Sequence, residues 1–163
     1  MRKNIVKEKL KKGEPVIGMW ISMGNPLAAE ILAHSGLDCL TIDIEHNPID
    51  MDNMLNCFYA IGTTDTVPFV RVPANDSAIL KRILDAGANG AVIPDIRTPE
   101  EAEKAVKSCL YPPHGIRGVG NIRGQLYGGP DYFERVNEET CIVLMIEDVA
   151  AVRGSHEACN RHD

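Results

Sequence analysis

The feature that most constrains the fold is a regular alternation of short β-type runs with amphipathic helical patterns. Helical periodicity fills the segments between the runs. Strands that alternate with helices form parallel sheets, so the sequence predicts an α/β fold. The runs expected to be strands are Pro15–Ile21, Cys39–Ile44, Pro68–Val72, Gly90–Ile93 and Cys141–Ile146.

Capping residues and glycines mark where the helices begin and end. Thr98-Pro99-Glu100-Glu101 combines a cap, a first-turn proline and two acids, and predicts a helix to about Cys109. Asp76 is expected to cap a helix that ends at Gly87. The lysine-rich segment before the first run is expected to be a surface helix. Two further helices are predicted over Pro26–Ser35, where Leu27, Ile31 and Leu32 share one face, and over Met51–Ile61.

Size and charge exclude several classes of protein. A chain of 163 residues is long enough for one domain with a real core. Its net charge of −6 argues against a nucleic acid partner, and no apolar run has the length to span a membrane. Five scattered cysteines contain no Cys-x-x-Cys pair and are typical of reduced thiols. We therefore expect a cytoplasmic protein without nucleic acid or membrane partners.

Reactive side chains follow strand after strand. The second run ends in Asp43-Ile-Glu45-His46, the third contains Arg71, Asp95 follows the fourth, and Glu147-Asp148 follow the fifth. Charged groups are costly in a buried strand, which indicates a site, although helix caps or solvated loop groups would also account for them.

Two architectures fit these observations. Chain length favours an open doubly wound sheet, because a complete (β/α)8 barrel takes about 250 residues. Residue placement favours the barrel, in which the carboxyl ends of all strands converge on one mouth. No Gly-x-Gly-x-x-Gly motif follows the first strand, so a dinucleotide site has no support.

Seven motifs in order resemble those of the HpcH/HpaI family of class II pyruvate-dependent aldolases, and they cover the chain to about residue 150. They are Gly18-Met-Trp20, Ala29-Glu30 with Gly36-Leu-Asp38, Asp43-Ile-Glu45-His46, Val70-Arg71, Leu84-Asp85-Ala-Gly87, Tyr111-Pro-Pro113 with Gly115-Ile-Arg-Gly118-Val-Gly120, and Met145-Ile-Glu147. The resemblance implies a (β/α)8 TIM barrel. It also implies a metal-dependent lyase that cleaves 4-hydroxy-2-oxo acids to pyruvate and an aldehyde through a pyruvate enolate.

The resemblance also assigns roles to individual residues. It implies that His46 is the catalytic base, that Asp85 raises the basicity of this base, and that Arg71 binds substrate and stabilises the developing enolate. It implies that Glu147 is a ligand to a divalent metal, Mg or Mn for a site built of oxygens. From the residues alone, Arg71 could instead form a structural salt bridge with Asp43 or Glu45.

Two departures from the family pattern stand out. The substrate-contacting position two residues before Glu147 holds Met145 instead of glutamine, and a thioether cannot replace that donor. A second metal-binding aspartate and three further βα units of the family are not recognisable before Asp163. We therefore expect the first five βα units of a barrel in residues 1–150, an irregular tail over 151–163, and a C-terminally truncated enzyme.

The incomplete pattern leaves alternatives to an active aldolase. A catalytically impaired or inactive remnant is one, and a flavodoxin-like binding module, favoured by length alone, is another. The expected partners are a small 2-oxo acid substrate and further copies of the chain in a homo-oligomer.

Overall fold

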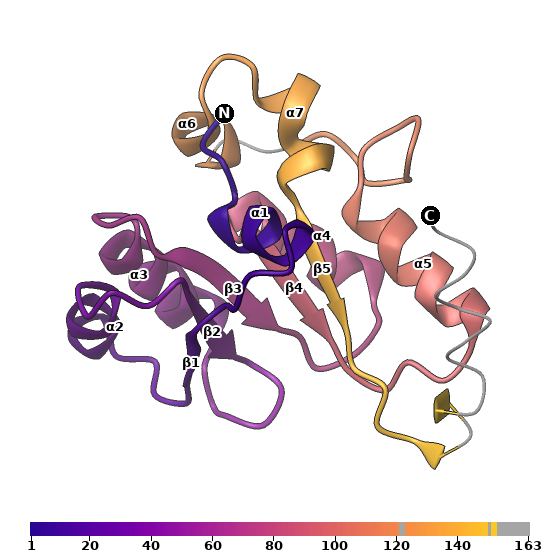
Figure 1. Cartoon of the computed structure of the whole chain (residues 1–163), viewed down its shortest axis with the longest axis horizontal. Helices are drawn as coiled ribbons and strands as arrows, with labels where there is room; N and C mark the ends of the chain where they lie inside the picture. The colour runs from indigo at the N-terminus through magenta and orange to yellow at the C-terminus, as the bar shows by residue number, and fades with distance from the viewer. Residues whose placement is uncertain (121–122, 150, 153–163) are drawn as a thin grey trace.

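The computed structural model describes residues 1–120, 123–149 and 151–152, which form one parallel sheet with helices on both faces. The five strands lie side by side in chain order and point the same way (Figure 1). They are β1 (Gly18–Ile21), β2 (Cys39–Asp43), β3 (Val67–Arg71), β4 (Gly90–Ile93) and β5 (Cys141–Leu144). All five predicted strands are confirmed, with boundaries that move by up to three residues.

The strand order decides between the two architectures. In a doubly wound or flavodoxin-like sheet the order in which strands are added reverses at a switch point. In a barrel each strand is added beside the previous one. Here the order is β1-β2-β3-β4-β5 without a reversal, so the flavodoxin-like alternative is wrong. In the part of the chain that the structure describes, β1 and β5 are the edges of the sheet. The fold is therefore an incomplete TIM-type barrel.

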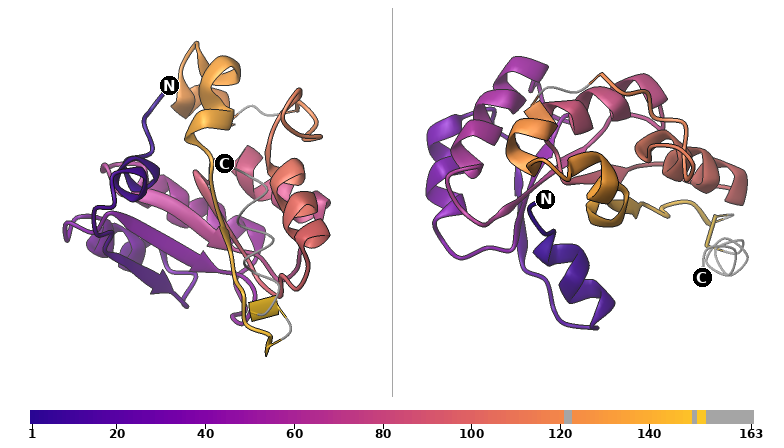
Figure 2. Two further views of the ribbon diagram at one scale, coloured as in Figure 1. Left: turned by 45° about the vertical axis from the view of Figure 1, so that its right-hand side comes forward. Right: turned by 90° about the horizontal axis from the view of Figure 1, so that it is seen from above.

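The helices divide between the two faces of the sheet. Four of them pack on one face as the crossovers between successive strands, and α1 lies on the other (Figure 2). The crossover helices are α2 (Pro26–Ala33), α3 (Met51–Ile61), α4 (Ser77–Ala86) and α5 (Pro99–Cys109), and α1 spans Ile5–Lys11. Two short helices, α6 (Arg123–Gly128) and α7 (Tyr132–Glu139), precede β5. None of the described helices is long and apolar enough to cross a membrane.

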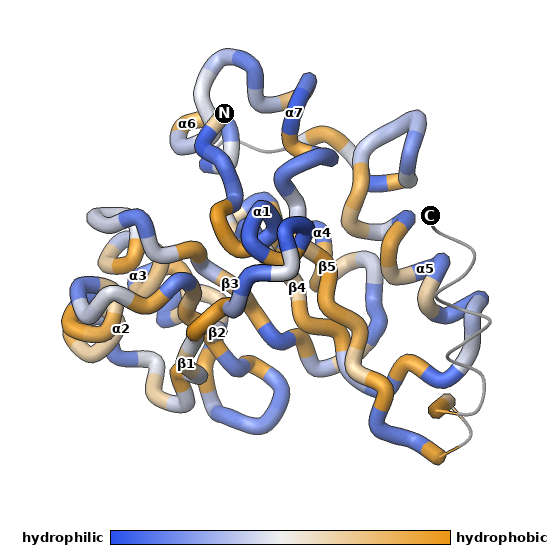
Figure 3. The backbone as a smooth tube through the Cα atoms, viewed as in Figure 1, coloured by the Kyte–Doolittle hydropathy of each residue, from blue (hydrophilic) through white to orange (hydrophobic). Residues whose placement is uncertain are grey.

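The main core lies between the sheet and α2 to α5. It takes alternate strand residues such as Ile42, Val70 and Ile93 on the sheet side, and Phe58 and Leu80 on the helix side. Side chains alternate along each strand, so the residues between them form the opposite face. Along the tube of Figure 3 the strands are hydrophobic for most of their length, and the loop after β2 is hydrophilic.

The helix α2 packs differently from the prediction. Its apolar residues Leu27 and Ile31 do share a face, but each is 64% exposed. The buried contacts come from Ala29 and Ala33, whose small side chains let α2 approach α3 and the sheet closely. Of the three residues predicted to share a face, Leu32 packs against the core, whereas Leu27 and Ile31 face away from it.

The helix α1 is more than the predicted surface helix. Its Val6 joins a small cluster on the second face of the sheet, together with Val67, Phe69 and Val92. Asn4 caps the helix by accepting from the N–H of Lys7 at 3.1 Å. The Asn4 amide also donates to the carbonyls of Asn89 and Glu139, both at 2.9 Å. These bonds fix α1 against the amino end of the sheet.

Candidate active site

The reactive side chains that follow β2, β3 and β5 gather at the carboxyl end of the sheet. Asp43 and Arg71 are the last residues of β2 and β3 and stand opposite each other in the ladder. Glu45 and His46 lie in the loop that leaves β2, and Glu147 lies three residues beyond β5. Parallel pairing in register brings these strand ends to one edge of the fold.

Arg71 is fixed by two carboxylates. Its Nε donates to Asp43 Oδ1 at 2.8 Å and its Nη2 donates to Asp43 Oδ2 at 2.6 Å, a bidentate pair. Glu45 Oε2 lies 3.1 Å from the same Nε. Both salt bridges that the residues alone left open are therefore present. Among the described residues, no hydrogen bond uses Nη1 of Arg71.

The Asp43 carboxylate also organises the loop that carries the base candidate. Its Oδ1 accepts from the backbone N–H of Glu45 at 3.1 Å, and its Oδ2 accepts from Asn47 Nδ2 at 2.5 Å. Asp43 is almost fully buried. The hydrogen bonds from Arg71 hold the pKa of the Asp43 carboxyl below its ordinary value, and the same contact raises the pKa of Arg71.

His46 stands at the rim of this cluster. Its side chain is 69% exposed, and its Nε2 lies 3.6 Å from Glu45 Oε1. Glu45 thus lies between the imidazole and the guanidinium of Arg71. An exposed imidazole next to a carboxylate can exchange protons with a small molecule that enters from the solvent.

Glu147 is held by an unusual turn after β4. The backbone N–H of Asp95 donates to Glu147 Oε1 at 3.1 Å. Asp95 has φ 56°, a left-handed conformation that aspartate tolerates better than most residues. This turn fixes one oxygen of an exposed carboxylate at the mouth. Glu147 also contributes to the raised pKa of Arg71, behind Asp43 and Glu45, so its charge lies near the guanidinium.

Asp85 does not lie at the carboxyl end of the sheet with the other predicted site residues. It is the penultimate residue of α4, which runs back from the carboxyl end to the amino end of the sheet. There its Oδ1 accepts from Arg117 Nη2 at 2.7 Å. His46 stands beyond the opposite ends of the strands, and a five-residue strand alone is about 13 Å long. Within one chain the structure does not bring Asp85 to His46.

Met145 lies just after β5 and packs against the cluster of Val6, Phe69 and Val92. Its backbone bonds the loop after β4, with N–H donating to Ile93 O and its carbonyl accepting from Ile96 N. The Met145 side chain therefore extends the apolar face of the sheet that carries Phe69 and Val92 toward the candidate site. No cluster of three or more His, Cys, Asp or Glu suited to a metal ion occurs within residues 1–120, 123–149 and 151–152.

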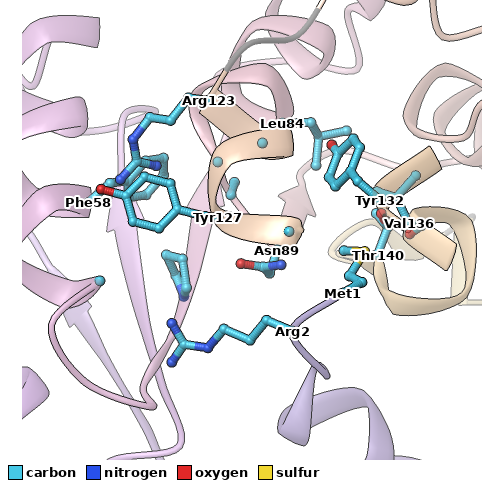
Figure 4. Close-up of a pocket in the computed structure, with 16 residues that line it drawn as sticks. Met1, Arg2, Phe58, Leu84, Asn89, Arg123, Tyr127, Tyr132, Val136 and Thr140 are labelled. Carbon is cyan, nitrogen blue, oxygen red and sulfur yellow. Dashed lines mark hydrogen bonds between the residues drawn. The ribbon is translucent and has the colours of Figure 1, made fainter. Parts of the chain in front are cut away.

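A cavity at the opposite end of the sheet has no part in this chemistry. It has a volume of about 40 Å³, and Met1, Arg2, Phe58 and Tyr127 are among its lining residues (Figure 4). Arg123 lies over the Tyr127 ring at 4.2 Å and donates to the carbonyl of Ala86. Arg123 also lies over the Tyr59 ring of α3 at 5.0 Å. These contacts join α6 to α3 and α4, so we interpret the cavity as a packing gap.

We expect the Asp43–Arg71 pair to make stability depend on pH in acid. Asp43 has a lowered pKa in the folded chain, so the unfolded chain takes up its proton first as the pH falls. The stabilisation is complete above about pH 5 and is lost as the pH falls through 4 and below. Urea denaturation of Asp43→Asn should show a lower free energy of unfolding at pH 7 and a shallower acid dependence than the parent.

The exposed Asp95 supplies the matched control for this measurement. Asp95→Asn should leave the acid dependence close to that of the parent chain, because the Asp95 side chain is 68% exposed and lies 3.6 Å from its partner Arg97. If the free energy of unfolding fell equally steeply with acid in the parent and in Asp43→Asn, the Asp43–Arg71 pair would not be the source of the acid dependence.

Two contributors to this site were not assigned from the sequence. The sequence gives Trp20 no role beyond its place in a motif, yet Arg71 lies over its ring. Asp95 was recognised as a reactive residue at a strand end, but its backbone N–H makes the contact to Glu147. The register of β1 against β2 would have indicated that Trp20 lies near Arg71. No sequence signal indicates the second, which depends on the conformation of one turn.

Comparison with known proteins identifies close relatives. The family described as HpcH/HpaI aldolase/citrate lyase matches residues 16–160. A hydroxypyruvate/pyruvate aldolase of Deinococcus radiodurans is 37% identical over 93% of this chain and 59% of its own length. A 4-hydroxy-2-oxo-heptane-1,7-dioate aldolase of Salmonella dublin is 40% identical over 89% of this chain and 56% of its own length.

Among solved structures, an HpcH/HpaI aldolase/citrate lyase family protein from Burkholderia cenocepacia J2315 superposes with a TM-score of 0.90. It is 36% identical, and the match covers 96% of this chain and 64% of that protein. The chain therefore spans between half and two thirds of the length of the proteins that it matches.

Proposed function

This chain belongs to the HpcH/HpaI aldolase/citrate lyase family, and we propose on that premise that it carries the chemistry of a pyruvate-forming aldolase. The reaction would cleave a 4-hydroxy-2-oxo acid into pyruvate and an aldehyde through the enolate of pyruvate. The observation that carries the proposal is the Arg71 guanidinium, which two carboxylates hold at the carboxyl end of the sheet while Nη1 makes no hydrogen bond among the described residues.

In the proposed mechanism Arg71 binds the oxygens of the 2-oxo acid. A guanidinium that already donates through Nε and Nη2 can present Nη1 to a carboxylate or to an oxygen that gains negative charge. Preorganised donors lower the barrier because they need not reorient as charge develops. Arg71 therefore acts on the enolate and not on the aldehyde half of the substrate.

His46 is the proposed base that removes the proton from the substrate hydroxyl. Its exposure leaves room for a water molecule between the imidazole and the substrate, and the Glu45 carboxylate lies 3.6 Å from the imidazole Nε2. Asp85 is proposed to raise the basicity of this base. Since it lies far from His46 in the same chain, that role requires a second copy, and self-association is part of the proposal.

A divalent cation, Mg or Mn, is the proposed cofactor. Asp43 and Glu45 pair with the Arg71 guanidinium and the charge of Glu147 lies near it, which leaves two surplus negative charges where an anionic substrate must bind. A hard cation would offset this charge, and Glu147 offers the carboxylate oxygens that such ions prefer. When bound, the cation would act as a Lewis acid on the 2-oxo group. Glu147 is thus the protein ligand that the described residues provide.

Met145 is proposed to contact the substrate through its thioether side chain. It cannot donate a hydrogen bond, so the orientation of the substrate carboxylate would depend on Arg71 alone. The free thiols of Cys39, Cys57, Cys109 and Cys141 suit a reducing compartment, which supports the cytoplasm as the proposed location.

A catalytically impaired chain remains the second candidate. The edges β1 and β5 of the described sheet lie far apart in strand order, and Trp20 and Val143 are partly exposed near them. The relatives are also longer than this chain by a wide margin. These observations favour a fold that depends on further strands for a rigid site.

A coupled pyruvate assay separates the two candidates. The purified chain is incubated with a 4-hydroxy-2-oxo acid and Mg²⁺ or Mn²⁺, and pyruvate is detected with lactate dehydrogenase. We expect metal-dependent pyruvate release that stops on addition of EDTA. A rate equal to the protein-free background, while a full-length relative is active in the same assay, would refute the active aldolase.

A further inference from the structure

Trp20 of β1 lies on the same face of the sheet as Arg71 of β3, although the strand β2 lies between them. Trp20 stands opposite Thr41 in the ladder of β1 and β2, and Asp43 stands opposite Arg71 in the ladder of β2 and β3. Thr41 and Asp43 point to one face because side chains alternate along a strand. The Arg71 side chain reaches over β2, and its guanidinium carbon lies 4.6 Å from the centroid of the Trp20 ring.

The indole restrains a motion that the carboxylates leave free. The bidentate bonds to Asp43 fix the edge of the guanidinium, but they restrain the tilt of its plane only weakly. A ring stacked on the face of the guanidinium limits that tilt through cation–π attraction. The edge and the plane of Arg71 are therefore set by different residues.

The charge of the cluster explains why an aromatic ring suits this place. Asp43, Glu45 and Glu147 already act on Arg71, and another carboxylate would compete with an anionic substrate for the guanidinium. The face of an indole attracts a cation without adding net charge. Trp20 can therefore hold Arg71 and leave its positive charge available.

We propose that Trp20 is a positioning residue that sets the plane of Arg71 and so presents Nη1 to the anionic oxygens of the substrate. This inference rests on the proposed substrate-binding function of Arg71. Trp20 acts through the guanidinium and does not need to touch the reacting atoms. Its effect should therefore vanish when the guanidinium is removed.

The first test detects the contact between Trp20 and Arg71 without an activity assay. Trp20 is the single tryptophan of the chain, so the intrinsic fluorescence reports on it alone. We expect the emission intensity or maximum of Arg71→Met, and of Arg71→Lys should the first variant fail to fold, to differ from that of the parent. Arg97→Met, at an exposed arginine that pairs with Asp95, should leave the spectrum unchanged. Identical spectra for the parent and a folded Arg71 variant would overturn the inference.

The second test asks whether the contact matters for binding. The Kd of oxalate, a planar dianion that mimics the pyruvate enolate, is measured by calorimetry with Mg²⁺ present. We expect Trp20→Leu to weaken binding by about 3- to 30-fold and Trp20→Phe to weaken it less, because phenylalanine keeps an aromatic face. Phe133→Leu, at a partly exposed aromatic residue of α7, should have no effect.

A double-mutant cycle completes the design. Trp20→Leu should weaken oxalate binding in the parent chain but not further in the Arg71→Lys chain. Equal losses in the two backgrounds, or less than a twofold loss in the parent, would overturn the positioning role. Absence of oxalate binding in the parent would overturn the presentation of Nη1 to substrate. Oxalate binding with this coupling but without pyruvate release would instead count against the proposed aldolase activity alone.

Discussion

Replacing Arg71 with lysine is expected to lower kcat/KM for the retro-aldol reaction by about 10²- to 10³-fold, the usual effect of removing one preorganised oxyanion donor. Lysine keeps the positive charge but cannot donate to Asp43 in the bidentate manner while it presents a third nitrogen to substrate. The loss should appear mainly in kcat, because the contact strengthens as the enolate forms. Steady-state kinetics with coupled pyruvate detection would measure it.

Arg97→Lys is the matched control for this substitution. Arg97 also lies near the carboxyl end of the sheet, but it is exposed and stands 3.6 Å from the exposed Asp95. The same exchange should therefore change kcat/KM by less than about twofold. Equal losses in both variants would show that charge near the mouth, and not the held guanidinium, governs the reaction.

Replacing Leu80 with alanine is expected to destabilise the chain by about 2–5 kcal/mol. Leu80 lies on the sheet side of α4, is 0% exposed and belongs to the main core. Truncation removes apolar contacts and leaves a cavity that packed neighbours fill only in part. Because ordinary domains are stable by about 5–15 kcal/mol, such a loss would leave little reserve. Urea denaturation at pH 7 would measure the change.

Leu27→Ala makes the same chemical change on α2 at a residue that is 64% exposed. In the isolated chain it should change the free energy of unfolding by no more than about 0.5 kcal/mol. A loss at Leu27 as large as that at Leu80 would show that the outer face of α2 is covered in solution. In that case the cost should depend on protein concentration, because association contributes to the stability of the folded state.

The sequence predicted the strands and crossover helices well because each has a strong local signal. The α3 and α5 boundaries agree with the structure, as a cap and an apolar periodicity mark both helices. Gly87 ends α4 as expected, with φ 110° in the left-handed region that glycine adopts at little cost.

Two helices and one helix face were missed for physical reasons. Three glycines interrupt α6 and the turn after it, and α7 is a short helix that buries only Tyr132 and Val136, so neither presents the longer apolar stripe of the crossover helices. In α2 the exposed face carries Leu27 and Ile31, while Ala29 and Ala33 make the buried contacts. Alanine gives a weak hydrophobic signal, so the sequence does not show which face is buried. Local pattern identifies a helix, but it does not state which face the rest of the fold will cover.

The candidate site followed from topology more than from any single motif. Strand ends in a parallel sheet meet at one edge, which is why the sequence alone groups Arg71 with the residues after β2. The location of Asp85 follows from the same rule, because the end of a crossover helix lies at the amino end of the next strand. The contact of Asp95 with Glu147 depends on one left-handed residue, which no periodicity reports.

The bonds that Asn4 makes have a consequence for the order of folding. Its partners Asn89 and Glu139 are 85 and 135 residues away in sequence. On a ribosome, α1 emerges before these partners and cannot dock until the start of β4 and the end of α7 have left the exit tunnel. Contacts of such long range carry a large loop-closure entropy and form late. Although α1 is synthesised before its partners, it is therefore expected to be among the last of the described elements to reach its native place, and its hydrogen exchange should report completion of the fold.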